Sequence, residues 1–214
     1  MTDHLPAALR ALWHELPLLA AAGVLVCTAS GVVVLLMPGL SPGSVLLSAL
    51  LVGPVWAGLV ATTDSVVRDG PGGVLLMLRS VRRCGPAGLE VAAVPAIIGA
   101  LALLNWTLYS GPLFLLPMAV SGCATVLAVL AACYAFSLRV TTGMRGRSLW
   151  FTSLALVARA PVVPLGIVAL GVVALMLGTS VTASLLLLAP GPVALFASAG
   201  TWTVYRTENH ALQR

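Results

Sequence analysis

Six long apolar stretches restrict what this chain can fold into more than any other feature of its sequence. Each holds about 20 residues, the length that an α-helix needs to cross the hydrocarbon core of a bilayer. The stretches are residues 17–37, 43–63, 88–109, 111–136, 161–177 and 181–203. They predict an all-α polytopic membrane protein with six transmembrane helices, folded as one membrane domain over residues 1–214.

The charge content points the same way. Only 8% of the residues are charged, whereas soluble domains carry about 25%. A soluble domain of this length could not cover its surface with so few charges, so lipid must be its solvent. The net charge of +5 is spread over short loops, which suits anionic lipid headgroups better than nucleic acid. We therefore expect the bilayer as a partner and no nucleic acid.

All eleven basic residues are arginines, and all lie on one side of the predicted membrane. The short turns between the first and second, third and fourth, and fifth and sixth stretches hold none. The positive-inside rule then places both termini and both longer loops in the cytoplasm. The chain is predicted to form three helical hairpins. The arginines expected to anchor it at the inner leaflet are Arg68, Arg79, Arg82, Arg83, Arg159 and Arg206.

Short amphipathic segments flank the spans. Residues 2–16 read as a helix lying on the inner leaflet. In residues 74–83, apolar side chains recur at helical spacing opposite arginines, and Gly85-Pro86 is expected to end that helix. Residues 148–159 have a weaker pattern, ended by Pro161. Membrane-surface anchoring and docking on a cytoplasmic partner, such as an ATPase subunit, both fit these segments.

The triplet Gly-Pro-Val occurs at Gly53 and again at Gly191, each time fifteen residues before an arginine. Fifteen helical residues rise about 22 Å, so arginines among the headgroups would put both triplets near the bilayer midplane. The second and sixth spans are therefore candidates for a parallel repeat. The residues expected to break these helices are Gly53, Pro54, Pro190, Gly191 and Pro192. Such breaks serve either close helix packing or a polar substrate cavity.

If the breaks serve a cavity, its walls would come from the second and sixth spans. The candidate substrate-binding residues are Trp56, Thr62, Thr63, Thr201 and Trp202, with Glu90 closing the inner end. Tryptophan stacks on sugar faces, and threonine hydroxyls can bond sugar rims. The chain has no recognisable catalytic motif, no metal-ligand spacing and no Cys-x-x-Cys pair. We expect no enzymatic activity, no metal and no cofactor.

An amphipathic segment precedes the first span, "GPVWAGL" lies in the second, "LMLRSVRR" follows it, and Arg159-Ala160-Pro161 leads into the fifth. This order of motifs resembles the YesL-like family of small bacterial membrane proteins. The resemblance implies a protein of the bacterial cytoplasmic membrane that assists a solute uptake system, with carbohydrate as the usual solute and ABC transporter components as partners. The alternative is a small transporter or permease-like subunit with a midplane site between spans two and six.

Overall fold

The computed structural model describes residues 16–69, 73–109, 114–180 and 189–212. Within these residues the regular elements are all helices, which confirms the all-α class. They are α2 (Leu16–Leu36), α3 (Pro42–Asp69), α4 (Val74–Leu108), α5 (Leu115–Thr142), α6 (Gly146–Arg159), α7 (Val162–Ser180) and α9 (Pro190–Leu212). Of the expected foot at residues 2–16, all but Leu16 lies outside the described residues.

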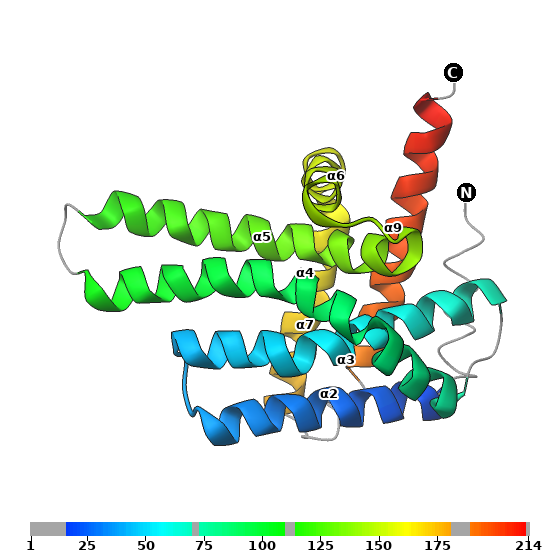
Figure 1. The fold of residues 1–214 in the computed structure, drawn as a ribbon, viewed down its shortest axis with the longest axis horizontal. Coiled ribbons are helices and arrows are strands. Elements are labelled where there is room, and N and C mark those ends of the chain that lie inside the picture. The colour runs from blue at the N-terminus through cyan, green and yellow to red at the C-terminus, as the bar shows by residue number, and fades with distance from the viewer. Residues whose placement is uncertain (1–15, 70–72, 110–113, 181–188, 213–214) are drawn as a thin grey trace.

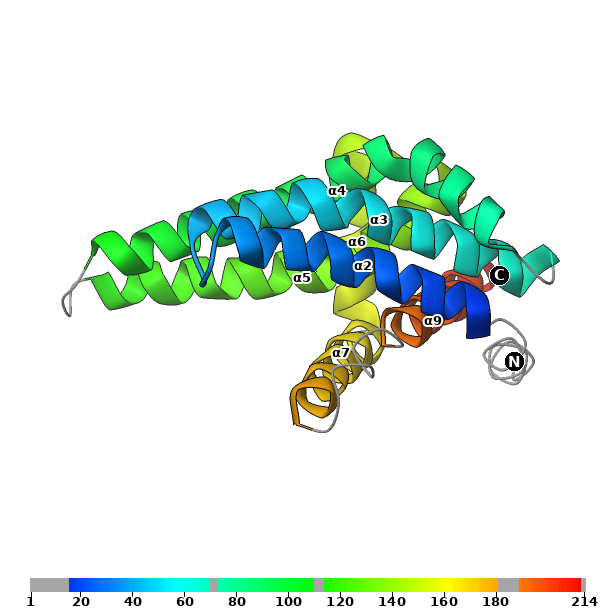
Figure 2. The same ribbon diagram turned by 90° about the horizontal axis from the view of Figure 1, so that it is seen from below.

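Helices α2 to α5 lie side by side along the long axis of the molecule (Figure 1). Helix α3 packs most extensively on α4, and α5 packs on α4 from the other side. The end of α2, the start of α3, the end of α4 and the start of α5 lie at the same end of this bundle. Helices α7 and α9 run across the bundle rather than along it, as both Figure 1 and Figure 2 show.

Three of these helices are long and apolar enough to cross a membrane: α3 over Pro42–Val66, α4 and α5. A fourth span results if α6 and α7 are taken together, although the chain bends by 89° between them. The apolar part of α2, Ala20–Leu36, is shorter. The structure therefore supports a membrane protein with three to four candidate spans, where the apolar stretches predicted six.

Helix α4 corrects one expectation directly. Gly85-Pro86 was expected to end a short amphipathic helix before residue 88, yet α4 continues through it as one helix of 35 residues. Its length of about 52 Å exceeds the ~30 Å hydrocarbon core. Pro86 removes one backbone hydrogen bond. However, α4 packs on α3 both before and after the proline, and these contacts can form together only if the helix continues through it.

Local signals account for several helix ends. At the start of α3, the Ser44 amide donates to Ser41 Oγ (3.1 Å) and the Ser41 amide to Ser44 Oγ (2.9 Å), with Pro42 at the first helical position. Helix α5 ends at Gly143, whose φ of 71° is left-handed. Helix α6 ends at Arg159 as expected, and the buried Tyr134 hydroxyl donates to the Ala160 carbonyl (2.7 Å) at the bend.

Candidate functional site

The first Gly-Pro-Val lies inside α3, which is continuous from Pro42 to Asp69 with Pro54 in its interior. The expected break at Gly53 and Pro54 is therefore not seen. A Cβ atom added to Gly53 would lie 2.7 Å from the Ala92 Cβ, and one added to Gly88 would lie 2.5 Å from the Gly53 carbonyl oxygen. The glycines let the backbones of α3 and α4 meet, as small residues commonly do in membrane helix pairs.

The second triplet lies at a helix start. Helix α9 begins at Pro190, so Pro190, Gly191 and Pro192 occupy its first turn. The Val193 amide donates to the Ala189 carbonyl (3.3 Å). Prolines fit the first turn because their missing amide hydrogens would have no partner within the helix.

Two of the six predicted substrate-binding residues, Thr63 and Trp202, link α3 to α9. Thr62, Thr63 and Thr201 are buried, and Trp202 is partly buried. Thr63 Oγ1 and Ser198 Oγ are 3.3 Å apart, and Trp202 Nε1 donates to Asp64 Oδ1 at 2.5 Å. The Thr62 and Thr201 hydroxyls donate to carbonyls of their own helices, those of Gly58 and Ala197 (2.8 Å each). The pairs Thr63–Ser198 and Trp202–Asp64 thus join the two helices.

Asp64 and Ser198 belong to this polar contact but are absent from the predicted set. Asp64 is buried and accepts a hydrogen bond from Trp202 across the helix contact. The only signal in the sequence was a carboxylate at the inner end of an apolar stretch. Its partner lies 138 positions away and could not be identified from spacing.

Trp56 packs against buried residues of α7 and α9, among them Val193 and Ala197, and it also lines an open groove of about 710 Å³ along α3, α4 and α5. On α4 the groove extends from Ala92 to Trp106, a rise of about 21 Å. Its lining is mostly apolar, and the Ser48 and Thr125 hydroxyls donate to carbonyls of their own helices. The small residues in the lining are Gly53, Ala49, Ala92, Ala96, Gly99, Ala102 and Gly122.

Glu90 lies apart from both regions. Arg139 of α5 donates to its Oε2 from Nη2 (2.9 Å) and Nε (3.1 Å). The Arg139 side chain is 9% exposed and that of Glu90 is 42% exposed. Glu90 also borders a second groove, of about 520 Å³, between α4 and α6. The structure therefore does not bring Glu90 to the α3–α9 contact, whose inner end it was expected to close.

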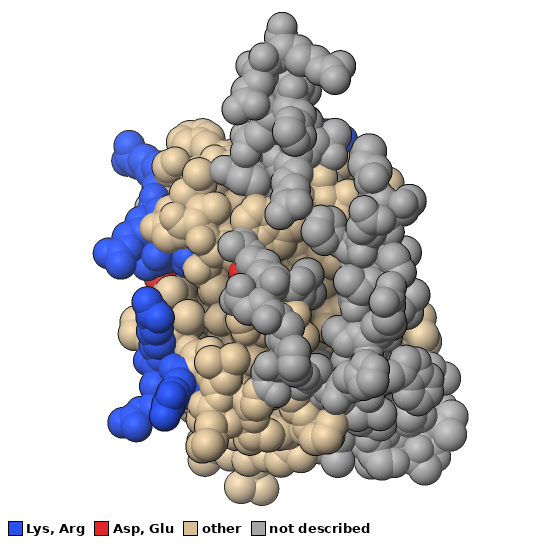
Figure 3. All heavy atoms as spheres, turned by 90° about the vertical axis from the view of Figure 1, so that its right-hand side faces the viewer, with Lys and Arg blue, Asp and Glu red and all other residues tan. Residues whose placement is uncertain are grey.

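Among the predicted anchors, Arg79, Arg82, Arg83 and Arg159 are exposed. Most of the arginines visible in Figure 3 gather along one edge of the molecule. Because α4 begins and α5 ends away from the end of the bundle where α4 ends and α5 starts, the arginines of α4 and α5 lie at the opposite end. The side chains of Arg68 and Arg206 lie outside the described part of the structure.

Residues that could hold a metal ion do not cluster in the described part of the chain: no three His, Cys, Asp or Glu side chains come together there. The four cysteines, Cys27, Cys84, Cys123 and Cys133, form no disulfide. The expectation of a chain without metal, cofactor or enzymatic activity stays a prediction.

Comparison with known proteins returned no match to this chain among protein-family models, curated proteins or solved structures. The resemblance to the YesL-like family accordingly rests on the sequence motifs alone.

Proposed function

We propose that this protein is an accessory integral membrane protein of a solute uptake system, and that its long apolar groove receives a transmembrane helix of the transporter. The observation that carries the proposal is the lining of that groove. Seven of its residues are glycine or alanine, and they extend over three helices. Small residues let a further helix approach closely, and van der Waals packing then holds it in lipid.

The same lining is poorly suited to a sugar. A sugar needs hydrogen-bond donors and acceptors, while the Ser48 and Thr125 hydroxyls already donate to their own helices. The walls therefore offer mainly dispersion contacts, which suit an apolar helix. Carbohydrate as the transported solute comes from the YesL-like resemblance alone.

The alternative is a small transporter with a midplane site between α3 and α9. It draws on the polar side chains that meet there: Thr63, Asp64, Ser198 and Trp202. Because those side chains already bond to one another in pairs across the contact, a substrate would have to displace these hydrogen bonds. This cost favours the accessory role.

The gathered arginines support the expected location. Arg79, Arg82 and Arg83 are exposed, and no carboxylate partner of theirs lies within the described residues. Each exposed arginine near an anionic leaflet contributes about 1 kcal/mol of attraction. We therefore place the protein in the bacterial cytoplasmic membrane with both termini in the cytoplasm. Reporter tags inserted between residues 110 and 113 should report the outside, and tags after residue 214 the cytoplasm; the reverse result would contradict this orientation.

Photo-cross-linking combined with transport assays tests the function. A photoreactive amino acid at Ala96, inside the groove, should form an adduct with the membrane subunit of an ABC uptake system. The same label at Val172 of α7, which is exposed but outside the groove, should react with lipid only. Deletion of the gene should lower the uptake of at least one labelled sugar, and the purified protein alone in liposomes should transport none.

Two results would contradict the proposal. Lipid adducts alone from the Ala96 position would remove the groove as a helix-binding surface. Sugar transport by the purified protein in liposomes would favour the alternative, with the protein as a transporter in its own right.

A further inference from the structure

The groove between α4 and α6 lies at the expected depth of the inner headgroups. Glu90, which borders it, is 18 residues from Leu108 at the far end of α4. Eighteen residues rise about 27 Å, close to the ~30 Å thickness of the hydrocarbon core. Val94 lies one turn deeper in the same groove, while Gly146 and Arg147 belong to the start of α6, beyond the end of α5. The groove thus extends from the headgroups into the hydrocarbon.

Together with Arg139, which bonds Glu90 from outside the lining, the charged residues at this groove sum to one positive charge. Glu90 is engaged by two hydrogen bonds from Arg139, so these two charges offset one another. Arg147 is exposed, and no carboxylate partner for it lies in the described part of the chain. A guanidinium binds phosphate through paired, charge-assisted hydrogen bonds. The uncompensated charge of the groove therefore suits a phosphate group.

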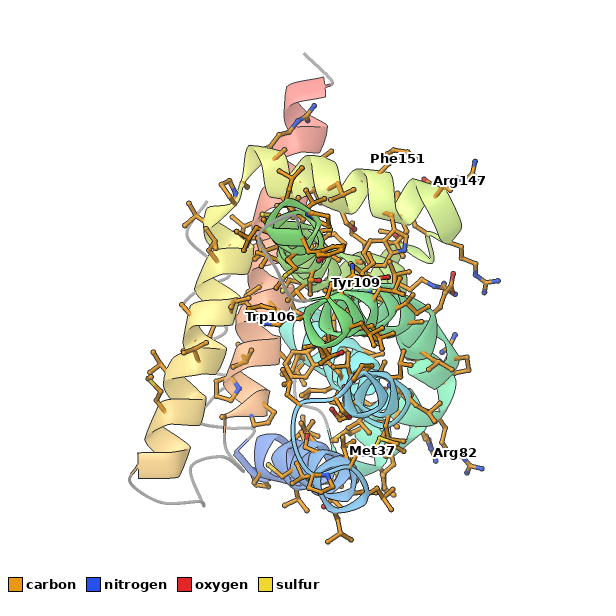
Figure 4. The ribbon with its side chains drawn as sticks, turned by 90° about the vertical axis from the view of Figure 1, so that its left-hand side faces the viewer. Met37, Arg82, Trp106, Tyr109, Arg147 and Phe151 are labelled. Carbon is orange, nitrogen blue, oxygen red and sulfur yellow. The ribbon has the colours of Figure 1, made fainter. Side chains whose placement is uncertain are left out.

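The remaining walls are apolar, and some are exposed. Phe151 is 71% exposed and Leu154 is 42% exposed on α6, and they face the groove together with Trp150 and Val94. Figure 4 shows Arg147 and Phe151 on the same helix, on the part of the molecule away from α7. Aromatic side chains prefer the interfacial layer of the membrane, where apolar and polar surroundings meet. A ligand here needs a charged head and an apolar tail.

We infer that this groove binds an anionic glycerophospholipid of the inner leaflet, with its phosphate on Arg147 and one acyl chain along Val94, Phe151 and Leu154. The inference does not depend on the proposed function. It differs from a general attraction to anionic lipid because it assigns one arginine and one apolar wall to a single lipid molecule.

A matched pair of arginine variants tests the site. The delipidated protein in detergent is titrated with phosphatidylglycerol or phosphatidylcholine, and bound lipid is counted by native mass spectrometry. Arg147→Gln should weaken phosphatidylglycerol binding about tenfold, the loss of a paired charge-assisted contact. Arg82→Gln removes an equal charge from an exposed arginine outside the groove (Figure 4) and should change binding less than about twofold, as for a remote surface charge.

Further results test whether Arg147 and the apolar wall bind one anionic lipid. Leu154→Gln should also weaken lipid binding, because it places an amide against the acyl chain. Equal weakening by Arg147→Gln and Arg82→Gln would overturn the site in favour of a diffuse charge effect. Equal affinity for phosphatidylcholine, or displacement of the lipid by soluble glycerol phosphate at the same concentration, would overturn the choice of an anionic lipid as ligand. Unchanged melting temperatures confirm that both arginine variants are folded.

Discussion

The triplet at Gly53-Pro54-Val55 and the triplet at Gly191-Pro192-Val193 are identical in sequence but lie in differently built parts of the molecule. In α3 the triplet is mid-helix, and Gly53 lies against the backbone of α4 at Gly88. In α9 it forms the first turn, and polar side chains further along the helix contact α3. One triplet thus permits close approach of two helices, and the other starts a helix.

This difference shows what a local motif does and does not determine. Glycine and proline set what the backbone can do at one position: come close to a neighbour, or begin a helix without an unpaired amide. Which of these is used depends on the neighbouring helix. For Gly53 that neighbour is α4, which presents its own glycine.

The largest effect should come from filling the α3–α4 contact. A Cβ at Gly88 would meet the Gly53 carbonyl oxygen at 2.5 Å and the Ala57 Cβ at 2.6 Å, so Gly88→Leu must push the helices apart. We expect a loss of about 3 kcal/mol in the free energy of unfolding. Gly31→Leu is the control, because nothing lies within 4 Å of a Cβ at that position. Unfolding in mixed micelles measures both, and similar losses would contradict close packing at Gly88.

The next largest effect should come from the α9 contact. Trp202→Phe removes the indole N–H that donates to the buried Asp64 carboxylate. A hydrogen bond to a charged group contributes about 1.5–3 kcal/mol, and we expect a loss of about 2 kcal/mol on the same unfolding assay. Trp106→Phe is the control, since Trp106 is 70% exposed. If both variants unfold alike, polar contacts do not hold α9 on α3.

The two prolines separate the triplets most clearly. Pro54→Ala restores an amide hydrogen in the middle of α3, and we expect a gain of about 1–2 kcal/mol, part of the ~3 kcal/mol that an interior proline costs. Pro192→Ala acts in the first turn of α9, where no intrahelical bond is regained, so the change should stay within about 0.5 kcal/mol. Equal gains from the two variants would mean that both prolines interrupt helices in the same way.

The smallest effect should come from the hydroxyl pair between α3 and α9. Thr63 Oγ1 and Ser198 Oγ are 3.3 Å apart, and hydrogen bonds between membrane helices average about 0.6 kcal/mol. A double-mutant cycle with Thr63→Val and Ser198→Ala should give a coupling energy of about 0.5 kcal/mol. A coupling near zero would leave the Asp64–Trp202 bond as the main polar link between the two helices.

The all-helical class and the membrane character could be predicted from the sequence, because a long apolar stretch can fold in few ways other than as a membrane helix. The extent of α6 was also close to expectation, since Pro161 lies two residues after its last residue, Arg159. The continuation of α4 through Gly85-Pro86 was missed. A proline inside a helix has a known local cost in stability. The packing that offsets this cost comes from α3 and cannot be inferred from the residues around Pro86.

The candidate sites were harder to predict than the helices. Thr63 and Trp202 were predicted to form walls of a cavity. In the structure they form hydrogen bonds with Ser198 and Asp64 across the contact between α3 and α9. These partners are 135 and 138 positions apart in the sequence, so only the packing of α9 on α3 brings them together. The groove of small residues was missed because its lining comes from four helices, and its alanines and glycines are spread over three of them.

Disulfide formation tests the central difference between the triplets most directly. A Cβ at Gly85 would lie 3.5 Å from the Pro54 Cβ, within the range that a disulfide spans. With the four native cysteines replaced by alanine, the pair Pro54→Cys and Gly85→Cys should cross-link rapidly in membranes under mild oxidation. The pair Pro192→Cys and Gly85→Cys should not. Cross-linking of the second pair, or failure of the first, would contradict the placement of the first triplet against α4 and the second at the start of α9.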